Sequence, residues 1–182
     1  MKTIAIVLSF LLFPLLGHSQ ILVSYDKSEG VDFSTYNTYQ IYNLEVTSIP
    51  EFEPKKTGLN LLIGEINKQM VARGYGKVSE NPDLIINLGV DITEEEQTRE
   101  TSIREAPMYI GQRNYHWSSE EIVIGRYKEG TVTLDLVDTA SNEMIWQAVA
   151  SGVLEKKQEK NEKKIVKVVK KLFKKYPVKV PK

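Results

Sequence analysis

The side chains with the greatest chemical potential lie in one aromatic stretch near the middle of the chain. This stretch contains His116 between Tyr115 and Trp117, and it begins with Tyr109 and Arg113. Aromatic rings and a guanidinium group offer large contact areas to a sugar or to a peptide side chain. The five residues are therefore candidate binding residues. The alternative is a loop that folds its aromatic side chains back onto the domain.

Carboxylates give no comparable indication of catalysis. Asp135 and Asp138 lie three residues apart in an extended segment, so their side chains point to opposite faces. The run Glu94–Glu96 lacks the spacing of a Ca²⁺-binding loop, and the chain has no phosphate-binding glycine loop, nucleophile elbow or HExxH helix. We therefore predict no catalytic residue, no metal and no cofactor, in a protein that is not an enzyme. The alternative is a hydrolase that uses His116 with an acidic residue.

A second candidate site is rich in lysine. Apolar residues recur at helical spacing over residues 165–176, which predicts an amphipathic helix that Pro177 ends. Its other faces carry Lys163, Lys164, Lys167, Lys170, Lys171, Lys174 and Lys175. Lys167, Lys171 and Lys174 are the candidate contacts to an anionic lipid headgroup, worth about 1 kcal/mol each near a charged membrane, or to a glycan. The alternative is a solvated face behind a stripe that packs on the sheet.

The charges are distributed unevenly along the chain. The 182 residues balance 24 Lys+Arg against 24 Asp+Glu and include no Cys. Residues 20–150 hold 11 basic and 21 acidic side chains, whereas residues 151–182 hold 12 Lys and three Glu. An acidic body and a basic end can attract each other within one molecule. The lack of Cys excludes disulfides, thiol chemistry, Cys-based zinc sites and a lipid attached through Cys.

The N-terminal residues have the pattern of an export signal. Lys2 precedes an apolar run from Ile4 to Leu16, which is shorter than the roughly 20 residues of a membrane span. Small residues at Gly17 and Ser19 predict cleavage after Ser19, and the alternative is an uncleaved anchor. We therefore expect a signal peptide over residues 1–19 and a single domain over residues 20–182, with no transmembrane span in the mature chain.

The apolar patterns predict an α+β domain. Residues 21–25, 38–44 and 84–92 alternate as strands do, and residues 59–73 have the period of a helix that Gly74 ends. Residues 93–120 lose this periodicity and are expected to form a loop. Three further strands are expected over 122–127, 131–138 and 143–152, with a turn at Glu129-Gly130. The expected fold has two layers, a mostly antiparallel sheet with both helices on one face.

Five segments, read together, resemble one bacterial family. They are Asp32–Tyr39 (DFSTYNTY), Arg73–Tyr75 with Asn81–Leu84 (RGY and NPDL), Glu129–Asp138 (EGTVTLDLVD), Ile145-Trp146 with Ala150–Gly152, and Tyr176-Pro177. They are similar to the motifs of the family called domain of unknown function 4136, over roughly residues 22–177. The resemblance implies an exported cell-envelope domain, often a lipoprotein, with no established activity or cofactor.

This chain departs from the family pattern at the lipid-bearing Cys. Gln20 stands near the place where that Cys would lie. We therefore expect no lipid anchor, and a protein that is periplasmic or secreted, with at most a loose association with the envelope. The predicted function is the binding of a partner protein or an envelope component. The alternative is peripheral binding of an anionic membrane or glycan through the lysine-rich helix; nucleic acid is not an expected partner, and the sequence leaves the oligomeric state open.

Overall fold

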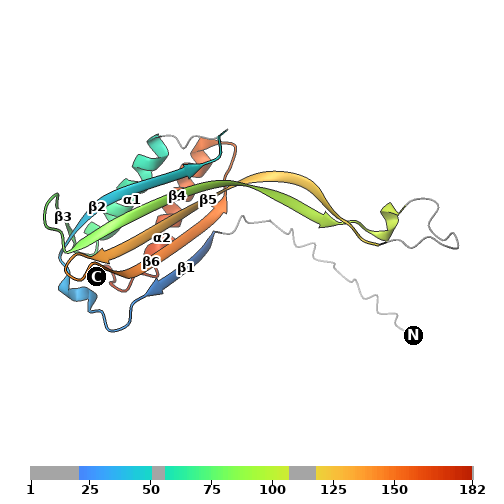
Figure 1. The fold of residues 1–182 in the computed structure, drawn as a ribbon. Helices are drawn as coiled ribbons and strands as arrows, with labels where there is room; N and C mark the ends of the chain where they lie inside the picture. The colour runs from blue at the N-terminus through green and yellow to red at the C-terminus, as the bar shows by residue number, and fades with distance from the viewer. Residues whose placement is uncertain (1–20, 51–55, 107–117, 182) are drawn as a thin grey trace, which may run out of the picture.

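A computed structural model describes residues 21–50, 56–106 and 118–181 (Figure 1). The predicted signal peptide and the aromatic stretch at 107–117 lie outside the described residues. The strands are β1 (Leu22–Lys27), β2 (Thr38–Ser48), β3 (Gly76–Lys77), β4 (Leu84–Glu100), β5 (Glu121–Asp138) and β6 (Glu143–Val153). The helices are α1 (Lys56–Val71) and α2 (Gln158–Phe173).

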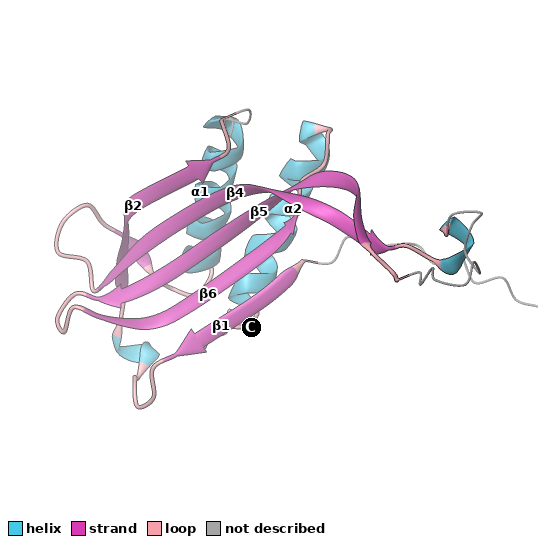
Figure 2. Cartoon of the chain, turned by 45° about the vertical axis from the view of Figure 1, so that its right-hand side comes forward, coloured by secondary structure: helices cyan, strands magenta, loops and turns pink. Residues whose placement is uncertain are grey.

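The strands form one sheet in the order β1-β6-β5-β4-β2-β3. β1 pairs antiparallel with β6, β6 with β5, and β5 with β4, whereas β2 runs parallel to both β4 and β3. Both helices cover the same face of the sheet (Figures 1 and 2). This arrangement confirms the predicted two-layer α+β fold with a mostly antiparallel sheet.

Helix α1 forms where the apolar period predicts it. Leu62, Ile66 and Met70 are buried against the sheet at a spacing of four residues. After the helix, Gly74 adopts a φ of 94°, and its N–H donates to the carbonyl of Val71. A residue with a side chain is strained at this φ, so the glycine is what allows the chain to turn back toward the sheet.

The core contains an aromatic cluster near the C-terminal end of α2. Trp146 of β6 packs edge-on against Tyr176, with ring centroids 5.1 Å apart, and the Tyr176 hydroxyl lies 2.9 Å from that of Tyr75. Arg73 donates to the carbonyls of Phe173 and Val178 at 3.0 and 2.9 Å. These contacts fix the C-terminal segment against the end of α1, and burial raises the pKa of Tyr176 above its usual value.

The expectation of a loop over residues 93–120 is wrong for residues 93–100, which form the outer part of a strand. β4 continues to Glu100 and pairs with β5 down to Glu121. β2 pairs with β4 only as far as Ile92, and β6 pairs with β5 only from Glu129 onward. The two strands then run on together as a ribbon that projects from the sheet (Figure 1). Both faces of residues 93–100 meet solvent, so this segment lacks the apolar alternation that predicts a strand, whereas the strand expected over 122–127 is part of β5.

The predicted turn at Glu129-Gly130 is also absent, because β5 is continuous through both residues. Gly130 pairs with Ile92 on one side and with Gly152 on the other. The nearest side chain to a Cβ built on Gly130 is Leu154, at 3.1 Å. The glycine therefore makes room for Leu154 over the sheet, and it marks a close approach rather than a turn.

Candidate binding pocket

A pocket opens between the two helices and the sheet at the end where the ribbon leaves the body. Its volume is about 270 Å³. The floor is the helix-facing side of the central strands, and the walls are the first turns of α1 and α2. The apolar lining consists of Ile21, Leu59, Leu62, Val90, Ile92, Val132, Ala150, Val153, Leu154, Ile165 and Val168.

The pocket exists because small residues lie across its floor. Two rows of paired residues cross the sheet there, one joining Val90, Val132 and Ala150 and the next joining Ile92, Gly130 and Gly152. These rows share the buried side of the sheet with Leu88, Leu134 and Ala148. Leu154 covers Gly130, but the small residues Ala150 and Gly152 fill little of the space between the sheet and the helices, and a pocket remains there.

The helix walls add to the opening. Gly58 lines the pocket in the first turn of α1, and a Cβ built on it would meet the nearest atom, Cδ1 of Ile165, at an ordinary 3.7 Å. Leu59 and Ile165 are half-buried rather than buried, as are Val132 and Val168. Aliphatic surface therefore reaches solvent on every side of the pocket.

The rim is polar and is held by its own hydrogen bonds. Asn161 exchanges two bonds of 2.8 Å with the backbone of Glu155, accepting from its N–H and donating to its carbonyl. Lys164 donates to the Glu155 carboxylate at 2.9 Å and to the carbonyl of Val153 at 2.7 Å. Hydrogen bonding and the charge of Lys164, followed by the charge of Lys160, hold the pKa of Glu155 below its ordinary value.

The distribution of apolar and polar groups in the pocket has the composition of a binding site. The charged groups that line the pocket lie at its mouth, and the described lining includes no histidine that could act as a base. The described residues also contain no group of three or more His, Asp or Glu side chains placed to hold a metal. An apolar interior with a few polar groups at the opening is the usual composition of a small-molecule site.

Of the binding residues predicted from sequence, the structure describes the lysines and not the aromatic stretch. Tyr109, Arg113, Tyr115, His116 and Trp117 are outside the described residues, so their proposed role remains a prediction. Lys167 and Lys171 on α2 and Lys174 directly after it are exposed, and none of them lines the pocket. Lys171 donates to the carbonyl of Ile21 at 3.3 Å, which ties the outer face of α2 to the start of β1.

Asp138 and Asp135 have different hydrogen-bonding partners in the structure. Asp138 caps the turn between β5 and β6, because its carboxylate accepts from the N–H of Ala140 at 2.9 Å and from the hydroxyl of Ser141 at 3.1 Å. Asp135 lies on the opposite side of the strand and accepts from the side-chain amide of Gln147 at 2.8 Å. The two carboxylates therefore have separate partners, and their opposite orientation follows from their spacing in β5.

The fold and the pocket together define a two-layer α+β domain with an apolar opening between its layers. The chain belongs to the family described as domain of unknown function DUF4136, whose model matches residues 23–178. A comparison with curated proteins finds no match. Among the described residues, no helix has both the length and the apolar character that crossing a membrane requires.

Solved structures with a similar fold come from several bacteria. A PDZ domain protein from Parabacteroides distasonis has a TM-score of 0.52 and 14% identity, over 87% of this chain and 36% of that one. The chain therefore corresponds to well under half of that protein. The PelC dodecamer from Paraburkholderia phytofirmans has a TM-score of 0.44 and 11% identity, over 84% of this chain and 97% of that one. Lipoprotein GNA1162 from Neisseria meningitidis has a TM-score of 0.39 and 11% identity, over 74% of this chain and 96% of that one.

Proposed function

We propose that this protein is a non-enzymatic binding domain of the bacterial cell envelope and that its pocket holds an aliphatic group of an envelope component. The apolar N-terminal segment supports export, to the periplasm or beyond the cell. The absence of Cys supports a chain without a lipid of its own. The observation that carries the proposal is the pocket of about 270 Å³ with aliphatic walls.

The size and chemistry of the pocket limit the ligand. A dry apolar cavity of about 150 Å³ holds a benzene-sized molecule, and ordinary ligand pockets begin at roughly 300 Å³. The present pocket therefore fits one branched side chain or the end of an alkyl chain, and the rest of a longer fatty acid would extend through the open mouth. Each methylene that leaves water contributes about 0.8 kcal/mol, so a short chain provides several kcal/mol against the cost of binding.

The rim supports a site that exists before the ligand arrives. Asn161 and Lys164 both bind the 153–155 segment, and Leu154 covers Gly130 from that segment. The pocket wall is therefore held by polar bonds that the ligand does not have to form. Pre-organisation of this kind reduces the ordering cost of binding.

A fluorescent fatty acid tests the proposal. We expect cis-parinaric acid to bind the purified exported protein in a saturable way, and Val132→Phe to weaken binding at least about tenfold by filling the pocket. The matched control is Val71→Phe, which adds the same ring at an exposed position outside the pocket lining. Absence of saturable binding, or equal binding by both variants, would contradict the proposed site.

A second measurement separates two sources of the aliphatic group. Organic extraction of protein purified from the envelope, followed by mass spectrometry, recovers an acyl lipid if a lipid fills the pocket. If a partner's side chain fills it, a branched apolar peptide displaces the probe and no lipid is recovered. If neither a lipid nor a peptide competes with the probe, the aliphatic ligand class is wrong.

The exposed lysines of α2 favour a second candidate function, which is binding to an anionic membrane or glycan. Among the described residues, Lys163, Lys167, Lys170, Lys171, Lys174 and Lys175 are exposed and form no ion pair. We expect vesicles containing an anionic lipid to retain the protein at low salt and to release it as salt rises.

A triple variant tests this second function. Lys167→Gln, Lys171→Gln and Lys174→Gln together should weaken retention on the vesicles, whereas Lys27→Gln, Lys56→Gln and Lys77→Gln remove the same charge from other elements and should not. Retention that changes neither with salt nor in the first triple variant would rule out the lysine face as the membrane-binding surface.

A further inference from the structure

The projecting ribbon has features of an interaction surface. We call it the arm and define it as residues 93–106 and 118–128. Its strand segments, Thr93–Glu100 and Glu121–Lys128, pair with each other, and neither pairs with another described strand. Each segment has eight residues, so the paired part is about 26 Å long. A two-stranded ribbon is at best marginally stable alone in water, which makes a partner along the arm favourable.

Aliphatic side chains are exposed in the middle of the arm. Val123 and Ile124 are adjacent in β5 and are 51% and 48% exposed. The register of β5 against β4 shifts at this point, since Gln97 pairs with Gly125 and Thr98 with Val123. Ile124 is thus the extra residue of a β-bulge, and the alternation of faces is interrupted there. The bulge presents two large aliphatic groups together at a place where the body of the protein does not cover them.

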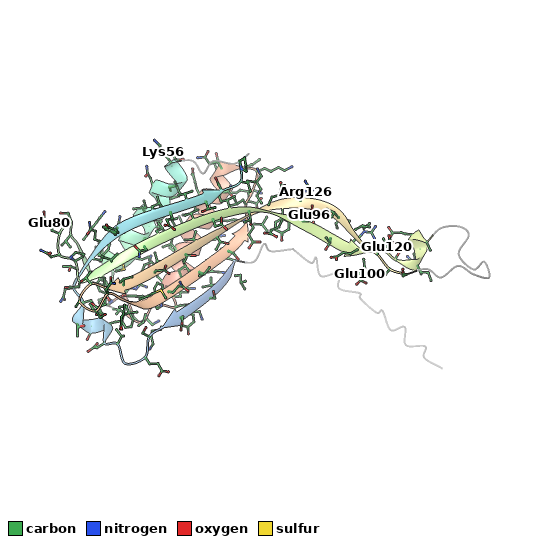
Figure 3. All side chains as sticks on the ribbon, viewed as in Figure 1. Lys56, Glu80, Glu96, Glu100, Glu120 and Arg126 are labelled. Carbon is green, nitrogen blue, oxygen red and sulfur yellow. The ribbon has the colours of Figure 1, made fainter. Side chains whose placement is uncertain are left out.

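Charges of opposite sign flank this aliphatic pair at equal distances. Glu121 lies two residues before Val123, and Arg126 lies two residues after Ile124. Arg126 also bonds Glu96 across the arm at 2.9 Å, but its side chain stays 62% exposed (Figure 3). A two-fold axis between Val123 and Ile124 therefore brings Glu121 of one chain to Arg126 of the other, twice. A two-fold interface requires this kind of self-complementary surface.

We propose that the arm is a self-association surface whose partner is a second copy of this chain. Two arms lie antiparallel, with Val123 of each against Ile124 of the other and with Glu121 facing Arg126 at both ends. The aliphatic contacts supply the affinity, and the charge pairs select the register. The contact is small, so the dimer is weak and depends on protein concentration.

Sedimentation equilibrium of the exported protein at roughly 10 to 500 µM suits a weak interface. We expect a monomer–dimer equilibrium whose dissociation constant rises about tenfold or more in Ile124→Asp, because each dimer loses the contact twice. Val71→Asp is the matched control, since Val71 is as exposed but lies at the end of α1. A wild-type protein that stays monomeric over the whole range would overturn the proposal.

Charge reversal tests the register independently. Glu121→Arg and Arg126→Glu should each weaken the dimer, because each places like charges at both ends. A mixture of the two variants should form heterodimers at least as well as the wild type associates. Glu80→Arg, at the far end of the molecule from the arm (Figure 3), is the control and should have no effect. Single variants that leave association unchanged, or a mixture that fails to associate, would show that the arms do not meet in this way.

Discussion

The two ends of the helix–sheet interface are packed in opposite ways. At one end, Trp146, Phe173 and Tyr176 fill the space between the layers and are almost completely buried. At the other, the sheet presents Gly130, Ala150 and Gly152, and a pocket remains. The same two helices and the same strands contribute to both ends. We therefore expect the stability of the fold to depend more on the aromatic end than on the end that contains the pocket.

The largest expected effect on stability comes from removing a side chain that fills the aromatic end. Trp146→Ala removes a large side chain that is 1% exposed and leaves a cavity under Phe173 and Tyr176. We expect the free energy of unfolding to fall by about 3 to 5 kcal/mol, measured by urea denaturation. A loss below about 1 kcal/mol would mean that the aromatic end is not the stable one.

A smaller effect is expected at the hydroxyl pair of the same end. Tyr176→Phe removes one partner of the 2.9 Å bond with Tyr75, whose hydroxyl keeps the carbonyl of Phe33 at 3.3 Å. Because that second partner remains, the expected loss is about 1 kcal/mol. Tyr25→Phe, at an exposed tyrosine, is the control in the same denaturation experiment.

Filling space at the end that contains the pocket should increase the free energy of unfolding. Gly58→Ala adds a methyl group at ordinary contact distance from Ile165 and replaces the poorest helix former other than proline. We expect a gain of about 0.5 to 1 kcal/mol in unfolding free energy, together with weaker binding of cis-parinaric acid if the methyl group narrows the pocket. Destabilisation by this variant would show that α1 and α2 are already in tight contact there.

The smallest effect concerns pH at the rim. The pKa of Glu155 is lowered by Lys164, so its ionised form contributes stability above its ordinary pKa and loses that contribution as the pH falls through the lowered value. Lys164→Met should raise this pKa toward 4.5, measured by NMR titration of the carboxyl carbon. Lys163→Met, one residue away and exposed, should leave the titration unchanged.

The sequence is sufficient to predict the parts of the fold in which one face is buried. Leu62, Ile66 and Met70 reveal α1, and Leu84, Ile86 and Leu88 reveal the inner part of β4, because burial imposes a period on the residue types. Residues 93–100 of the arm show no such period, because residues such as Glu94–Glu96 are exposed on a strand without a buried face. Gly130 resembles a turn residue in sequence, and only the register with Ile92 and Gly152 shows its role.

The pocket could not be predicted because it depends on alignment between strands. Ala150 and Gly152 are visible in the sequence as small residues, but their position beside Val132 and Gly130 follows from the pairing of β5 with β6. A row of small residues on a buried face is the signal that could have indicated the pocket. The aromatic candidates at 109–117 remain a prediction, and the candidate lysines Lys167, Lys171 and Lys174 are exposed.

The pairing of β1 with β6 also affects when the protein can fold. Leu22 lies opposite Ser151 and Lys27 opposite Trp146, so the first strand meets a partner made more than a hundred residues later. Contacts of such long sequence separation slow folding. During synthesis β1 is therefore made long before its partner strand, and the sheet can be completed only when β6 is available. The topology thus delays completion of the sheet until most of the chain has been made.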